Sequence, residues 1–110
     1  MKAKVFFADE KIRDIFVALK GSRRSEDQDL SVLLDRAFDA LSEDAFCGVQ
    51  IPKKQIPKTY RRHHSSLQNL WKYNLNDSWR LIYTVTSDGE TIVVIVEWLD
   101  HTAYERRFGY

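Results

Sequence analysis

Residues 78–99 read SWRLIYTVTSDGETIVVIVEWL and give the clearest structural signal in the chain. Two segments rich in β-branched and aromatic residues, 78–86 and 91–99, flank a short turn with Asp-Gly at its centre. This pattern predicts an antiparallel β-hairpin. The second segment is apolar at nearly every position, which indicates an inner strand with both faces covered. Residues 67–75, joined to the hairpin by Asn-Asp, and residues 3–8 predict two more strands.

Two amphipathic helices are expected in the first half of the chain. Asp9 can cap a helix over residues 10–20, where apolar residues recur at helical spacing. Ser25 and Gln28 have the spacing of a capping box, and Gly48 is expected to stop the helix that follows. The apolar stripe of this second helix comprises Leu30, Leu33, Leu34, Ala37, Phe38 and Leu41. Each helix has one apolar face, which predicts a helical hairpin packed on the sheet.

These elements predict an α+β fold, in which an N-terminal strand and a helical hairpin pack on a mostly antiparallel four-stranded sheet. A chain of 110 residues without repeats or low-complexity linkers indicates a single domain over residues 1–110. No apolar run reaches the length of a membrane span, and the first residues lead into a strand rather than a signal peptide. The single cysteine, Cys47, permits no internal disulfide and favours a cytoplasmic protein. We expect Cys47 to be a half-buried apolar residue rather than a nucleophile.

The net charge of +1 hides a local imbalance. Residues 51–64, IPKKQIPKTYRRHH, contain five Lys or Arg and two His but no acid. A clustered basic surface attracts polyanions even on a nearly neutral protein. This basic segment also contains both prolines of the chain, so it is expected to be a loop or a short ordered segment on the surface.

A second group of polar residues lies at the ends of the predicted hairpin. Arg80 is near the start of one strand, and His101 follows the other within the C-terminal tail DHTAYERRFGY. If these strand ends and the basic segment meet, they line one cleft. The alternatives are that Arg80 pairs with an acid at the sheet edge and that the tyrosines of the tail only pack it against the sheet. Glu97 either pairs with an arginine or acts as a base, and pairing is favoured because the strand looks buried.

A zinc site is not expected, because His63 and His64 are adjacent and therefore poor co-ligands of one metal with His101.

Two stretches, NLWKYNLNDSWRLIYTV (69–85) and IVVIVEWLDHTAYER (92–106), resemble the RelE/ParE superfamily of small toxins. The similarity follows the order of elements along nearly the whole chain. It implies the toxin of a type II toxin–antitoxin system, in the branch that cuts messenger RNA in the ribosomal decoding site. The partners implied are a cognate antitoxin, the ribosome and messenger RNA, and no membrane; a homodimer or a toxin–antitoxin hetero-oligomer would fit.

The resemblance also implies roles for individual residues, without a metal or a cofactor. Arg80 would hold the scissile phosphate, and His101 would act as an acid or a base. Tyr104 would stack on an unpaired base or orient His101. The RNA-binding residues expected on this basis are Lys53, Lys54, Lys58, Arg61, Arg62, His63, His64, Arg106, Arg107 and Tyr110. The identity of the general base stays open, with His63 or His64 as a second proton carrier.

Two other functions are compatible with the same resemblance. One branch of the superfamily poisons DNA gyrase without cleaving nucleic acid, and its members generally lack the basic and histidine set found here. An inactive member would only bind RNA or a partner protein. The presence of both Arg80 and His101 favours the RNA-cleaving branch.

Overall fold

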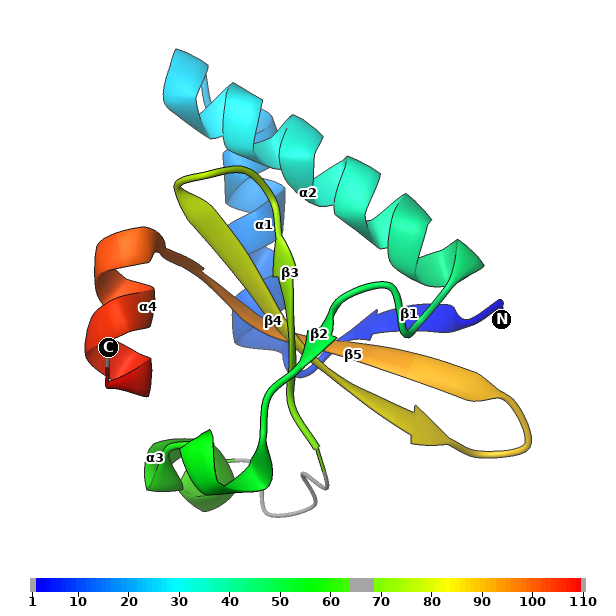
Figure 1. Cartoon of the computed structure of the whole chain (residues 1–110). Coiled ribbons are helices and arrows are strands. Elements are labelled where there is room, and N and C mark those ends of the chain that lie inside the picture. The colour runs from blue at the N-terminus through cyan, green and yellow to red at the C-terminus, as the bar shows by residue number, and fades with distance from the viewer. Residues whose placement is uncertain (1, 64–68, 110) are drawn as a thin grey trace.

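The structure, a computed structural model, describes residues 2–63 and 69–109, with the backbone alone described for residues 61–63. In chain order the elements are β1 (Lys4–Phe7), α1 (Glu10–Gly21), α2 (Ser25–Glu43), β2 (Val49–Gln50), the 3₁₀ helix η1 (Lys53–Gln55), α3 (Lys58–His63), β3 (Trp71–Asn74), β4 (Trp79–Ser87), β5 (Thr91–Asp100) and α4 (His101–Phe108). The strands form one sheet in the order β1-β5-β4-β3-β2 (Figure 1). This is the expected α+β class.

The sheet is mixed, because β1 runs parallel to β5 while the other neighbours are antiparallel. β5 lies between β1 and β4, which confirms that the most apolar segment is an inner strand. The expected count of four strands is wrong, since five are described. The additional strand, β2, has only two residues, too few to produce an alternating pattern in the sequence.

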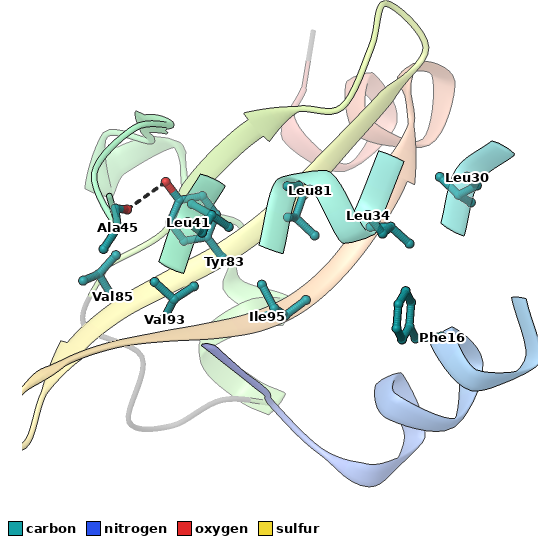
Figure 2. Packing of buried hydrophobic residues seen from close by; sticks show 11 residues of the cluster. Phe16, Leu30, Leu34, Leu41, Ala45, Leu81, Tyr83, Val85, Val93 and Ile95 are labelled. Atoms are coloured by element: carbon teal, nitrogen blue, oxygen red, sulfur yellow. Dashed lines mark hydrogen bonds between the residues drawn. The ribbon is translucent and has the colours of Figure 1, made fainter. Parts of the chain in front are cut away.

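One face of the sheet packs against the helical hairpin, and we call it the α1–α2 face. Leu34, Ala37 and Leu41 of α2 are completely buried on it. Figure 2 shows Leu34 and Leu41 among the side chains of this cluster. The buried residues of this cluster are Phe16, Leu30, Leu34, Ala37, Leu41, Ala45, Leu81, Tyr83, Val85, Val93 and Ile95. The apolar stripe expected on the second helix is therefore confirmed as a core face.

The opposite face of the sheet, which we call the α3–α4 face, has a second apolar cluster. Its buried residues are Ile51, Ile56, Tyr60, Leu70, Ile82, Val96, Leu99 and Tyr104. Ile82 belongs to this cluster and its neighbours Leu81 and Tyr83 to the other, because successive side chains of a strand point to opposite faces. Over residues 51–63 the basic segment is thus an ordered surface segment that contains η1 and α3, anchored by the buried Ile51, Ile56 and Tyr60.

The ends of the two long helices differ in how well the sequence predicted them. Asp9 caps α1 as expected, because its Oδ1 accepts a hydrogen bond from the Ile12 backbone N at 2.9 Å. The capping box is wrong: Arg24 occupies the N-cap of α2 without a side-chain bond, and the Gln28 amide donates to the Ser22 carbonyl instead. α2 also ends at Glu43, before the glycine expected to stop it.

A β-bulge interrupts the pairing of β4 with β5. Tyr83 is opposite Ile95, but Ile82 is opposite Glu97, so Val96 is an extra residue without a partner on β4. Val96 and Glu97 consequently lie on the same face, the α3–α4 face, although they are adjacent in sequence.

The C-terminal residues form a helix, α4, where the sequence suggested only a tail. The Asp100 carboxylate caps it by accepting from the Ala103 backbone N at 2.8 Å, and Gly109 ends it in the left-handed conformation with φ of 79°. Among the described helices, none is long and apolar enough to cross a membrane.

Candidate functional site

Arg80 lies on the α3–α4 face at the start of β4. It is opposite Leu99 of β5, a residue of the cluster on that face. Its Nη1 donates to the backbone oxygens of Asn76 at 2.9 Å, Trp79 at 3.2 Å and Asp77 at 3.3 Å. Within the described residues no carboxylate pairs with Arg80, so the alternative of an ion pair at the sheet edge has no support. The guanidinium is held in place by neutral acceptors and keeps its charge available for an anion.

His101 begins α4 at the same end of the sheet. Its backbone N donates to the Ser78 carbonyl at 2.7 Å, one step beyond the Trp79–Asp100 pair of β4 and β5. The two strands therefore bring the backbones of Arg80 and His101 together, as the sequence reasoning required. The imidazole is exposed, and its Nε2 is 3.7 Å from Glu105 Oε1 one turn later.

Tyr104 occupies a different environment from the one its proposed base-stacking role needs. Its side chain is 5% exposed, and its ring stacks on Phe108 with 4.7 Å between centroids. The ammonium of Lys72 lies 5.3 Å from the ring centroid. Burial in the cluster leaves no open ring face for an RNA base. In this structure the ring packs α4 on the sheet, which is the alternative that the sequence left open.

Lys72 is a further cation of this face that the sequence reasoning missed. It lies on β3 opposite Ile82, which places its side chain on the α3–α4 face together with Arg80. Its side chain is half-buried, and its ammonium sits over Tyr104. The register of β3 with β4 was the missing information, because a lone lysine in a short strand gives no signal by itself.

The basic segment forms a border beside this face. Lys53 and Lys54 are exposed on η1, and Lys58 is exposed at the start of α3. The segment is anchored by Ile56 and Tyr60, both buried on the α3–α4 face. Of the remaining expected RNA-binding residues in it, Arg61, Arg62 and His63 lie on α3 with their side chains outside the described part, and His64 lies outside the described residues.

The arginines of α4 have different surroundings. Arg106 is exposed. Arg107 Nη1 donates to Glu97 Oε2 at 2.8 Å, and its guanidinium lies 5.7 Å from the Tyr60 ring centroid. The favoured reading of Glu97 as an ion-pair partner is confirmed. Arg107 is therefore engaged within the protein, and Tyr110 lies outside the described residues.

Two further titratable groups bear on the chemistry. Burial, and after it the neighbouring Glu97 carboxylate, raise the pKa of the Tyr60 hydroxyl, so this group stays neutral. Cys47 is exposed rather than half-buried, but local desolvation and the Asp44 carboxylate raise the pKa of its thiol. A raised pKa lowers the thiolate fraction, which agrees with the expectation that Cys47 is not a nucleophile. No cluster of three or more His, Cys, Asp or Glu side chains suited to a metal ion occurs within residues 2–60 and 69–109.

Comparison of the sequence with models of known protein families and with curated proteins gives no match to either. The candidate site therefore rests on the residues that the sheet and α4 bring to the end of the sheet where β5 meets α4. That arrangement combines an oriented arginine, an exposed histidine, a neighbouring lysine and a basic border.

Proposed function

We propose that this protein is the toxin of a type II toxin–antitoxin pair and cleaves messenger RNA on the ribosome. The observation that supports this most directly is the meeting of Arg80 and His101 at one end of the sheet. One residue supplies a fixed, unneutralised charge for a phosphate, and the other supplies a proton carrier that works near neutral pH. Lys53, Lys54 and Lys58 add a basic border for the RNA backbone.

The proposed reaction is the attack of a ribose 2′-hydroxyl on the adjacent phosphate. A base removes the hydroxyl proton as the new O–P bond forms, and the bond to the 5′-oxygen breaks as an acid protonates that oxygen. Arg80 stabilises the charge that grows on the phosphate oxygens. His101 acts as the acid or the base, and the residues of this chain need no metal or cofactor for these roles. Tyr104 supports His101 only indirectly, by packing α4.

The test uses translating ribosomes that carry a defined messenger RNA, with cut sites read by primer extension. Wild-type protein should cut within codons on ribosomes and cut naked RNA little. His101→Ala and Arg80→Ala should each lower the rate by a factor of about 10²–10⁴, as loss of a proton-transfer group typically does. Arg36→Ala is the control, because this exposed arginine of α2 has the same charge change on the opposite side of the sheet.

Other outcomes assign other functions. Cutting that persists in the double variant of Arg80 and His101 would remove these residues from the chemistry. Toxicity that appears as DNA damage with intact messenger RNA would favour the gyrase-poisoning alternative. Binding of RNA without cutting by the wild type would indicate the inactive, RNA-binding alternative.

A further inference from the structure

A cavity of about 540 Å³ lies where α1, α3, α4 and β5 meet, and His101 is not among the residues that line it. This volume is within the range of about 300–1,000 Å³ that is typical of small-molecule sites. Ile12 and Val96 give it apolar walls, and Tyr60 adds an aromatic ring. Lys11 and Arg107 supply positive charge at its lining, and Asp9 and Glu97 supply negative charge.

The β-bulge places an acid in this cavity. Because Val96 is the extra residue, Glu97 lies on the α3–α4 face and lines the cavity beside Tyr60. The Glu97 side chain is 23% exposed, and only Arg107 is ion-paired with it among the described residues. A carboxylate has about four lone-pair sites, so the bond to Arg107 leaves acceptor capacity for a ligand.

The second polar group of the cavity is the Tyr60 hydroxyl. The Tyr60 side chain is 3% exposed, and its hydroxyl lacks a hydrogen bond of normal geometry among the described residues. It lies near Glu97 and Arg107, which both influence its titration. Buried polar groups almost always have partners, so a hydroxyl beside Glu97 that lacks a well-formed hydrogen bond is a polar group that a ligand in the cavity can engage.

We propose that this cavity receives an unpaired nucleobase that carries an exocyclic amino group, with Glu97 as the acceptor of that amino group. Single-stranded RNA is read in this way, by apolar or aromatic contact with a splayed-out base and hydrogen bonds to its edge. Carboxylates accept from the amino group of cytosine. Lys11, which also lines the cavity, supplies a positive charge for the phosphate of the same nucleotide. Because α4 carries both His101 and Arg107, a base bound in the cavity would also help to select the site of cutting. This part of the proposal rests on the proposed function.

Cytidine and uridine monophosphate provide the test, because they share the ribose, the phosphate and the ring shape and differ only along one base edge: cytosine has an amino group at the 4-position and an acceptor at N3, and uracil has an oxygen and an N–H there. Each is titrated into the ¹⁵N-labelled protein, and the backbone amides of Lys11, Ile12, Thr59 and Glu97 are followed by NMR. Cytidine monophosphate should shift these amides and bind at least about fivefold more tightly than uridine monophosphate. Glu97→Gln should abolish or reverse this preference, because an amide can also donate to the uracil oxygen.

Two variants keep the test decisive. Tyr60→Phe removes only the hydroxyl, so it should weaken the binding of cytidine monophosphate by about threefold or more without lowering the melting temperature. If Glu97→Gln unfolds the protein because the ion pair with Arg107 is lost, Tyr60→Phe takes its place in the test. Glu90→Gln, an exposed acid of the β4–β5 turn, has the same charge change and should leave binding unchanged.

Equal binding of the two nucleotides, no binding, or shifts confined to the α1–α2 face would overturn the proposal. So would a short Lys- and Arg-containing peptide that shifts the same amides when cytidine monophosphate does not, since the cavity would then belong to a protein partner. The outcome is separable from the proposed function. Nucleotide binding without messenger RNA cutting would leave the cavity assigned and reject the nuclease, and cutting without a base preference at the cavity would do the reverse.

Discussion

Gly48 is expected to tolerate no side chain, although its backbone is not in the left-handed region. A Cβ atom at this position would overlap the Tyr83 hydroxyl and lie 2.5 Å from the backbone oxygen of Lys72. The Gly48 backbone N also donates to the Tyr83 hydroxyl at 3.1 Å, and this hydroxyl donates to the Ala45 carbonyl at 3.1 Å (Figure 2). The chain after α2 is therefore fastened to β3 and β4 at a point without spare volume.

The cost of Gly48→Ala follows from these contacts. Overpacking typically costs about 1–3 kcal/mol, and a shift of the Tyr83 ring leaves buried polar groups unpaired at about 1–3 kcal/mol more. The reduced entropy of the unfolded chain offsets about 0.4–1 kcal/mol of this. We expect a net loss of about 2–4 kcal/mol in the free energy of unfolding, and a melting temperature lower by ~10 °C.

Urea unfolding in a double-mutant cycle with Tyr83→Phe tests the origin of this loss. Removing the hydroxyl removes one of the two clashes, so Gly48→Ala should cost less in the Tyr83→Phe background than in the wild type by at least about 0.5 kcal/mol. Gly21→Ala is the matched control, because a Cβ there meets nothing within 4 Å and should be neutral or stabilising. Equal effects of Gly48→Ala and Gly21→Ala, or an additive cycle, would refute the reasoning.

Two predictions concern the core and the basic border. Leu34→Ala should lower the free energy of unfolding by about 2–5 kcal/mol, because Leu34 is completely buried between α2 and the sheet; a loss under about 0.5 kcal/mol in urea titration would contradict this packing. Replacing Lys54 and Lys58 with Ala should weaken RNA binding and flatten the slope of log affinity against log salt by about 1.4, as expected for two lost contacts to single-stranded RNA. Lys20→Ala with Arg36→Ala, on the helical hairpin, removes the same charge and should leave that slope unchanged.

Local signals in the sequence predicted the parts of the fold that local physics controls. The Asp9 cap, the apolar stripe of α2 and the Asp-Gly turn each depend on residues a few positions apart, and each is confirmed. α4 was missed although Asp100 offers the same capping signal as Asp9, because the helix begins directly where β5 ends and no loop separates them. β2 needed β3 as a partner and could not be read from two residues.

The candidate site was predicted in part for the same reason. The predicted hairpin has the correct alignment at its ends, so the sequence correctly placed the backbones of Arg80 and His101 close together. Lys72 was missed, and the packing role of Tyr104 was only one of the alternatives, since the side on which a residue lies depends on register across strands and on how α4 folds back. Neither property is encoded within one segment of the sequence.

The β-bulge at Val96 affects both the fold and the candidate site, because it sets the face of every later residue of β5. With regular pairing, Glu97 would share the face of Val93 and Ile95 and would bury a carboxylate against the apolar helical hairpin. The extra residue instead turns Glu97 toward Arg107. It also places Leu99, rather than Trp98, beside Arg80 on the α3–α4 face.

The same shift fixes where α4 begins. Asp100 comes opposite Trp79, and the next backbone N bonds to Ser78, so His101 enters the helix at the strand end that carries Arg80. Without the bulge, the pairing of β5 with β4 would shift by one residue, so α4 would begin one residue away from its present position relative to Arg80. Glu97 would then no longer line the cavity. One unpaired valine in a continuous apolar run thus controls the geometry of both the candidate catalytic pair and the proposed base-binding cavity.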